Sequence, residues 1–266
     1  MRLFLFACFL LCSQMVLGQT LEVSSIEELE QHVDDKTLVI LDIDNTLMRP
    51  TQTLGSDEWF CDYYQKCLAA CRDSKQARLQ AVDLWHQIER LSDYQTMEKN
   101  TAAAVTRLQD KNLPVMALTT RSMDITDATF RQLAMCGIDL KKCAPIHENF
   151  WVPGIDQVLW KDGVLFSTGR HKGQVLQAFL DHTHLHPTRI VFINDKLAHL
   201  KEVESACDVR GIEFLGLRYS GADSYVANYR RDLGDVQLKV FQKLLSDQEA
   251  QILLDQQKQA IATARK

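Results

Sequence analysis

The sequence contains no internal repeat, no low-complexity linker and no cluster of basic residues. Its 266 residues include 30 Lys and Arg against 35 Asp and Glu, a formal net charge of −5, so nucleic acid is not an expected partner. No apolar run is long enough for a polytopic membrane protein. The remaining composition, 46% apolar and 24% charged, is that of a globular chain with room for one large α/β domain carrying an insertion.

The N-terminal segment, residues 1–18, has the pattern of a cleaved secretory signal peptide. Arg2 gives a positive start, Leu3–Leu11 is a short apolar run, and the sequence VLG ends in a small residue ahead of Gln19. An uncleaved N-terminal anchor is the alternative. A lipoprotein is disfavoured, because no cysteine here has both an apolar segment and a small residue before it. We therefore expect a periplasmic or secreted chain that has no membrane attachment after cleavage.

Removal of this segment leaves an even number of cysteines, which permits disulfide bonds in an exported protein. They are Cys61, Cys67, Cys71, Cys136, Cys143 and Cys207. The sequence does not choose among the many possible pairings, although Cys136–Cys143 would close a short loop and is the pairing we expect. The absence of a C-x-x-C motif weakens a zinc-ribbon or redox interpretation.

Apolar runs alternate with helical patterns along the chain, which predicts an α/β fold: a three-layer, Rossmann-like parallel sheet covered on both faces. Buried strands are expected at 38–43, 114–119, 189–193 and 213–217, and a hairpin at 157–167. Helices are expected at 124–136, 172–181 and, as one long helix, 233–260.

The helical patterns at 56–110 are longer than one crossover between parallel strands needs. They predict a helical cap, inserted at 50–112, that lies over the carboxyl edge of the sheet. Ligands bind at this edge in open α/β folds. The α/β core is then expected to comprise residues 19–49 and 113–266.

The strongest chemical signal is DIDNT at 42–46, directly after the first apolar run. Alternate residues of an extended segment project the same way, so Asp42 and Asp44 can both face the edge of the sheet. Close carboxylates raise each other's cost of ionisation, so one can be a nucleophile and the other a proton donor. A calcium loop is disfavoured, because Leu47 and Thr53 stand where an EF-hand needs Gly and Glu. A plain solvated turn is the other alternative.

Three further strand and helix ends support this signal. Thr119 ends the second strand and is followed by Thr120 and Arg121, where hydroxyl and backbone N–H groups can hold a phosphoryl oxygen, although threonine also caps helices. Lys172 opens a helix, where a cation is unfavourable unless an anion is nearby; a solvated surface lysine is the alternative. Asp195 follows the third strand and can complete a divalent cation site with Asp42.

In this order, DIDNT, ALTTR, HKG and FIND resemble the motifs of the haloacid dehalogenase (HAD) superfamily of phosphotransferases. The resemblance covers about residues 36–220 and is greatest to an exported bacterial branch. It implies that Asp42 attacks phosphorus, that Asp44 protonates the leaving oxygen and then activates water, and that Lys172 balances charge. It also implies that Thr119 binds the phosphoryl group, with Thr46, Thr120 and Arg121 as further substrate contacts. Mg²⁺ would bind Asp42, Asp195 and the backbone carbonyl of Asp44.

Two features bear on the metal. A phosphate dianion about 4 Å from one carboxylate costs roughly 8 kcal/mol at an effective dielectric constant of about 20, which Mg²⁺ and Lys172 would offset. Asn194 stands where many relatives carry an acid, so the site would have two carboxylates.

Other candidate residues have plainer interpretations. His182, His184 and His186 alternate along a predicted loop and could form a zinc site, but no fourth ligand is nearby. Trp59, Tyr63 and Trp85 could line a substrate pocket in the cap, but aromatic residues at helical spacing more often pack in a core.

The sequence therefore predicts a magnesium-dependent phosphomonoesterase that acts on a small phosphorylated substrate. A dehalogenase is disfavoured because it has no use for Asp44, and an ATP-driven pump because it needs transmembrane helices. The rival from another class is a catalytically silent protein that uses the site to hold a phosphorylated ligand or a partner.

Overall fold

The computed structural model of the protein describes residues 18–71, 73–241 and 245–264. Residues 1–17 of the expected signal peptide lie outside the described residues. In the described part of the chain, no helix combines the length and the apolar character that crossing a membrane requires.

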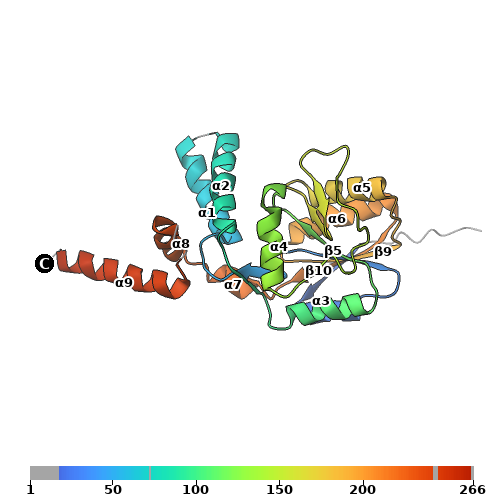
Figure 1. Ribbon diagram of the computed structural model, residues 1–266, viewed down its shortest axis with the longest axis horizontal. Coiled ribbons are helices and arrows are strands. Elements are labelled where there is room, and N and C mark those ends of the chain that lie inside the picture. The colour runs from blue at the N-terminus through green and yellow to red at the C-terminus, as the bar shows by residue number, and fades with distance from the viewer. Residues whose placement is uncertain (1–17, 72, 242–244, 265–266) are drawn as a thin grey trace, which may run out of the picture.

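An eight-stranded, mostly parallel sheet forms the centre of the molecule (Figure 1). Its strand order is β1-β10-β9-β2-β5-β8-β7-β6, and the pairings from β1 to β8 are parallel. The predicted hairpin is confirmed as β7 and β8, which pair antiparallel. The predicted fold class is confirmed. The strands are β1 (Gln19–Val23), β2 (Thr37–Leu41), β5 (Val115–Thr119), β6 (Phe150–Trp151), β7 (Leu159–Lys161), β8 (Val164–Phe166), β9 (Arg189–Asn194) and β10 (Glu213–Tyr219).

Helices cover both faces of this sheet. Successive residues of a buried strand point to opposite sides, so each face has its own apolar core beneath its helices. Val39 and Leu41 of β2 belong to the core beneath η1, α3 and α4, whereas Leu38 and Ile40 belong to the core beneath α5 and α6. The helices are η1 (Ile26–Gln31), α3 (Thr101–Asp110), η2 (Met123–Ile125), α4 (Thr126–Met135), α5 (Lys172–Thr183), α6 (Leu197–Arg210) and α7 (Asp223–Ala227).

The helices α1 (Asp57–Cys71) and α2 (Ser74–Glu89) pack on each other and stand clear of the sheet (Figure 1). The chain enters them through β3 (Met48–Pro50) and returns through β4 (Tyr94–Thr96), which pair antiparallel. The expected cap range, 50–112, also contains α3, whose buried residues Val105 and Leu108 share the core of β2. The helical pair α1 and α2 therefore forms the part of that range that projects from the sheet.

The single helix predicted over 233–260 is wrong. The structure has two helices there, α8 (Arg231–Lys239) and α9 (Asp247–Ala264). Ser246 and Glu249 cap the start of α9 reciprocally, since the N–H of each residue donates to the side chain of the other. On α8, the backbone at Gly234 lies against the ring of Trp59, so this end of the chain packs beside α1 and not on the sheet.

The predicted disulfide Cys136–Cys143 is also wrong, because all six cysteines of the described chain are free thiols. The two side chains have separate surroundings. Cys136 lies against Met48 in the core, and the Cys143 thiol donates to the carbonyl oxygen of Gln109.

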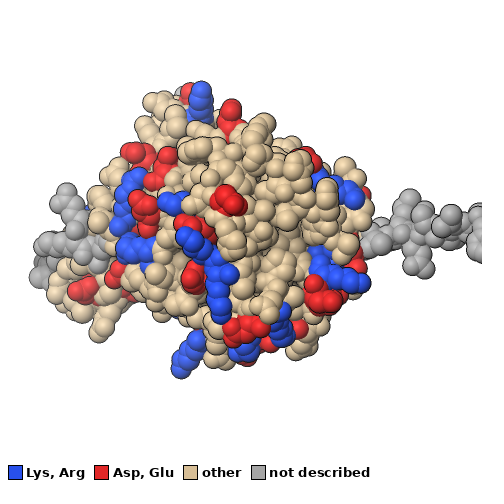
Figure 2. Space-filling view, turned by 45° about the vertical axis from the view of Figure 1, so that its right-hand side comes forward, with Lys and Arg blue, Asp and Glu red and all other residues tan. Residues whose placement is uncertain are grey.

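Acidic and basic side chains are interleaved on the face of the molecule that Figure 2 shows. Exposed ion pairs occur in the structure, such as Lys142–Asp110. Exposed pairs contribute little to stability, so the electrostatics that matter most are those of the buried groups.

Candidate active site

Three neighbouring strands bring the predicted residues to one edge of the sheet. Asp42 follows β2, Thr119 ends β5, and Asp195 follows β9, and β2 lies between β5 and β9. The backbone N–H of Asp42 donates to the carbonyl oxygen of Ile193, which ties the ends of β2 and β9 together. Segments far apart in sequence therefore meet, as expected for the carboxyl edge of a parallel sheet.

Lys172 pairs directly with Asp42, its Nζ donating to Oδ1 at 2.6 Å. The lysine side chain is 0% exposed and that of Asp42 is 7% exposed, so a solvated surface lysine is excluded. Burial raises the pKa of Asp42, although Lys172 opposes this shift. The pair therefore places a cation against the predicted nucleophile, away from bulk water.

The HKG segment positions this lysine at the start of α5. The Glu202 carboxylate of α6 accepts the backbone N–H of Lys172 at 2.6 Å, and a Cβ at Gly173 would collide with the Glu202 carbonyl oxygen. Glycine therefore allows α5 to approach α6 closely, with Lys172 directed at Asp42.

Asp195 is the second buried carboxyl group at this edge. Burial first, and then the nearby charge of Asp42, raise the pKa of Asp195 to about 8. Its backbone N–H donates to Thr46 Oγ1 at 3.2 Å, while Asn194 directs its Oδ1 to the N–H of Lys196. Two neighbouring carboxyl groups that resist ionisation suit a divalent cation.

The oxygen donors present fit Mg²⁺ better than zinc. Among the described residues, no group of at least three His, Cys, Asp or Glu side chains could hold a metal ion. Mg²⁺ commonly takes one or two protein carboxylates and fills its shell with water and phosphate oxygens. Asp42 and Asp195 fit that pattern. The alternative of a zinc site at His182, His184 and His186 gains no support, and His182 packs against Phe150.

The DIDNT segment forms a tight, buried turn. Ile43 accepts backbone N–H groups from Thr46, Leu47 and Met48, and Asn45 adopts a left-handed φ of 57°. Asn45 donates its side-chain N–H to Glu58 at 2.8 Å. Asp42, Asn45 and Thr46 are buried, so this is not a plain solvated turn.

Arg121 binds both carboxylate oxygens of the second aspartate of the turn through one edge of its guanidinium. Its Nε lies 2.9 Å from Asp44 Oδ2, and its Nη2 lies 2.7 Å from Oδ1. The arginine side chain is 0% exposed, whereas that of Asp44 is 26% exposed. Arg121 therefore orients Asp44, while its predicted contact with substrate stays a prediction. Thr46 is buried and its hydroxyl accepts the backbone N–H of Asp195, and its substrate contact likewise stays a prediction.

Behind Arg121 lies a buried carboxyl group that the sequence did not reveal. Glu89, the last residue of α2, lies 3.5 Å from Arg121 Nη2 and accepts hydrogen bonds from Tyr94 and Gln132. Burial raises the pKa of Glu89 to about 7, although Arg121 opposes the shift. The end of the cap helix is thus connected through Arg121 to Asp44.

The raised pKa of Glu89 predicts that the stability of the protein depends on pH. The folded protein favours protonated Glu89, so the free energy of unfolding should fall as the pH rises from about 4.5 to about 7 and then level off. Glu89→Gln should remove this component, making the variant more stable than wild type by up to about 3 kcal/mol at pH 8 but not at pH 4. Urea unfolding at pH values across this range measures the difference. A difference independent of pH would contradict it.

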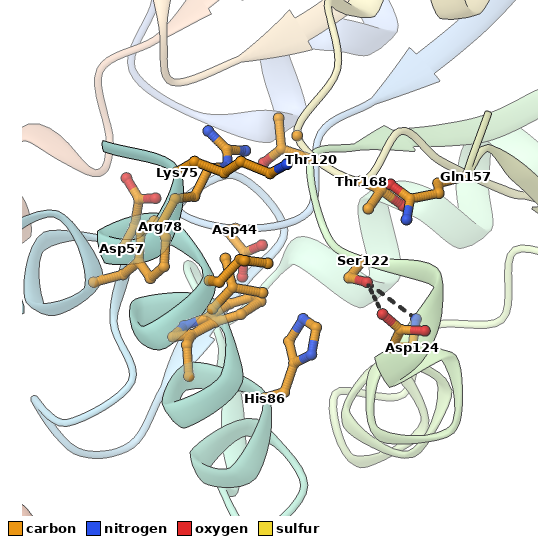
Figure 3. Close-up of a pocket in the computed structure, with 15 residues that line it drawn as sticks. Asp44, Asp57, Lys75, Arg78, His86, Thr120, Ser122, Asp124, Gln157 and Thr168 are labelled. Carbon is orange, nitrogen blue, oxygen red and sulfur yellow. Dashed lines mark hydrogen bonds between the residues drawn. The ribbon is translucent and has the colours of Figure 1, made fainter. Parts of the chain in front are cut away.

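A cavity of about 330 Å³ opens beyond these buried groups, between α2 and the loops that follow β5 and β8 (Figure 3). Asp44, Thr120 and Trp85 line it, whereas Asp42, Thr119 and Lys172 do not. Thr120 and Trp85 therefore lie on the cavity wall, and their contact with substrate stays a prediction. Trp59 and Tyr63 do not line the cavity; they stack on each other with ring centroids 5.0 Å apart.

A second ion pair joins the cap to the strand ends. Lys196, next to Asp195, donates to Asp57 of α1 at 2.5 Å. Burial lowers the pKa of Lys196, but the Asp57 carboxylate outweighs that effect and the pKa is raised. The position of Lys196 beside FIND was the only sequence signal for this contact.

Sequence comparison places the chain near chlamydial proteins. The model of a family described as "Protein of unknown function (DUF2608)" matches residues 22–251. A "Putative outer membrane protein" of Chlamydia muridarum (strain MoPn / Nigg) is 28% identical over 257 residues, spanning 94% of this chain and 97% of that protein. A protein of the same description from Chlamydia pneumoniae is 26% identical over 262 residues, spanning 97% and 99%.

Solved structures show distant similarity. A "putative beta-phosphoglucomutase" from Thermotoga maritima has a TM-score of 0.41 at 12% identity, with 72% of this chain and 98% of that chain covered. The class C acid phosphatase from Bacillus anthracis has a TM-score of 0.34 at 14% identity, with 82% of each chain covered. Similarity at this level establishes no shared activity.

Proposed function

The chain belongs to the family described as "Protein of unknown function (DUF2608)", and we propose that it is an exported, magnesium-dependent phosphomonoesterase that forms an aspartyl-phosphate intermediate. The observation that carries this proposal is the buried Lys172–Asp42 pair, adjacent to Asp195 at the strand ends. This arrangement provides a nucleophile, a cation and a candidate metal ligand together.

In the first step, an Asp42 oxygen forms a bond to phosphorus while the bond to the leaving oxygen breaks. Lys172 holds Asp42 Oδ1, which leaves Oδ2 as the attacking atom. Asp44 lies on the cavity wall and is the proposed general acid: it gives a proton to the leaving oxygen, and Arg121 holds the carboxylate that results.

In the second step, water attacks phosphorus and the bond to Asp42 breaks. Asp44 takes the proton from that water, so both carboxylates return to their starting states and inorganic phosphate is released. Arg121 keeps Asp44 oriented toward the cavity through both steps. Mg²⁺ held by Asp42, Asp195 and the Asp44 carbonyl would offset charge on the phosphoryl oxygens.

Export is supported by two independent observations. The N-terminal sequence has the pattern of a signal peptide, and the relatives are named for an envelope location. A fusion of residues 1–18 to a reporter active only outside the cytoplasm tests this part of the proposal.

Phosphate release from an aryl phosphate tests the enzymatic part. The mature chain should hydrolyse p-nitrophenyl phosphate with Mg²⁺, and chelation should lower the rate by about a thousandfold, since a metal supplies several kcal/mol of charge stabilisation. Re-addition of Mg²⁺ should restore the rate. An unchanged rate in EDTA would contradict the metal requirement, and no release with any divalent ion would contradict the activity.

A further inference from the structure

The cap places two basic side chains, Lys75 and Arg78, on the wall of the cavity that contains Asp44 (Figure 3). Both project from α2, three positions apart and hence on one helical face. A Cβ at Gly169, on the loop after β8, would collide with Arg78 Nη2, so the guanidinium reaches across to the opposite wall.

Among the residues that the structure describes, neither side chain has an acidic partner. Within the described part of the chain, Lys75 and Arg78 form no ion pair, whereas the cavity acids Asp44 and Asp57 are paired with Arg121 and Lys196. The remaining acid, Asp124, accepts from Ser122 and lies with His86 on the other side of the cavity (Figure 3). The Lys75 and Arg78 side therefore has an excess of positive charge.

The position of Lys75 is locally unfavourable for a cation. It lies in the first turn of α2, near the positive end of the helix dipole, and that turn contains no acidic residue. The carboxylate of Asp73 is used as the N-cap, accepting the N–H groups of Lys75 and Gln76. A cation kept at such a place without a partner suits an anion from outside the chain.

This anion is distinct from the phosphoryl group that would be transferred. In the proposed mechanism that group would lie with Asp42, Thr119 and Lys172, none of which lines the cavity. The cavity begins at Asp44, the proposed donor to the leaving oxygen, so it accommodates the leaving group. Its walls include the apolar side chains of Phe60, Leu79 and Trp85.

We infer that the substrate is a phosphomonoester whose leaving group carries a second oxyanion, a carboxylate or a phosphate, bound by Lys75 and Arg78. An apolar spacer between the two anionic groups packs on the aromatic wall. The inference rests on the proposed phosphomonoesterase function and narrows its substrate class.

Binding to the Asp42→Asn chain with Mg²⁺ tests this inference without turnover. The probes are phenyl phosphate, para-carboxyphenyl phosphate and para-phenylene bisphosphate, which share one spacer and differ in the second group. Titration calorimetry should show about tenfold tighter binding for at least one doubly anionic probe, as for a charge-assisted contact. The probe with the larger gain identifies carboxylate or phosphate as the second oxyanion.

A second variant tests whether Lys75 and Arg78 cause the tighter binding of the doubly anionic probes. Adding Lys75→Gln and Arg78→Gln should abolish the gain and leave the affinity for phenyl phosphate within about twofold, because these exposed side chains are proposed to contact only the second anion. Lys36→Gln, an exposed lysine that precedes β2 at the opposite edge of the sheet, is the matched control and should change nothing.

Two results would overturn the inference: equal affinity for all three probes, or equal weakening of phenyl phosphate in the double variant. The second result would mean that the cations hold the transferred phosphoryl group. A third outcome is that the wild-type chain binds the doubly anionic probes more tightly through Lys75 and Arg78 and yet hydrolyses none of them. In that case the inferred ligand class stands and the phosphomonoesterase proposal fails.

Discussion

Asp42→Asn should lower the rate of aryl phosphate hydrolysis by about 10⁴-fold or more, the scale expected when a covalent nucleophile is lost. The amide has nearly the shape of the carboxylate, but it offers no anionic oxygen to phosphorus. The measurement is the initial rate of phosphate release at saturating Mg²⁺, for wild type and variant purified in parallel.

The variant also leaves Lys172 buried without its anion, so loss of activity must be separated from loss of folding. Asp42→Asn paired with Lys172→Met removes both charges and should restore the melting temperature but not the activity. Asp35→Asn, an exposed residue before β2, is the control for the substitution itself and should retain full activity.

Equal rates for wild type and Asp42→Asn would remove the enzymatic assignment from this site. The rival, a silent protein that holds a phosphorylated ligand, would then be favoured. That protein should still bind phenyl phosphate, and its affinity should depend on Lys172. The two functions therefore differ in turnover and share the same pocket.

The edge of the sheet could be predicted from sequence because its signals are local. A buried parallel strand is an unbroken apolar run, and the residue after it must lie at the carboxyl edge. Asp42, Thr119 and Asp195 follow from that rule without knowledge of any side-chain contact. The same rule gave no orientation for Arg121, which turns inward to Asp44 and away from the cavity.

Residues that act through tertiary contacts left no such signal. Glu89 ends a cap helix and Gln132 lies on α4, and only packing brings them together behind Arg121. The start of α9, by contrast, has a local sequence signal, since Ser246 and Glu249 have the spacing of a capping box. The helical periodicity continues through this signal, so the sequence predicted one helix over 233–260 where the structure has two.

Arg121→Met should lower the free energy of unfolding by about 3–5 kcal/mol, because removing one partner of a buried charge network leaves the others uncompensated. The guanidinium serves both oxygens of Asp44 and also donates to Thr129 and Gln132. Methionine fills similar volume but satisfies none of these acceptors. Urea unfolding at pH 7 measures the loss, and Arg131→Met, at a side chain 40% exposed on α4, the helix that carries Thr129 and Gln132, should cost much less.

Arg121→Lys distinguishes two roles of Arg121, the orientation of Asp44 and the supply of a buried positive charge. Lysine keeps the positive charge but cannot bind both carboxylate oxygens in a fork, so stability should recover in part while kcat stays low. A KM near the wild-type value would agree with a residue that orients Asp44 without touching substrate. An Arg121→Met chain within about 1 kcal/mol of wild type would mean that Asp44 and Glu89 do not depend on this guanidinium, because loss of a buried charge partner costs more than that.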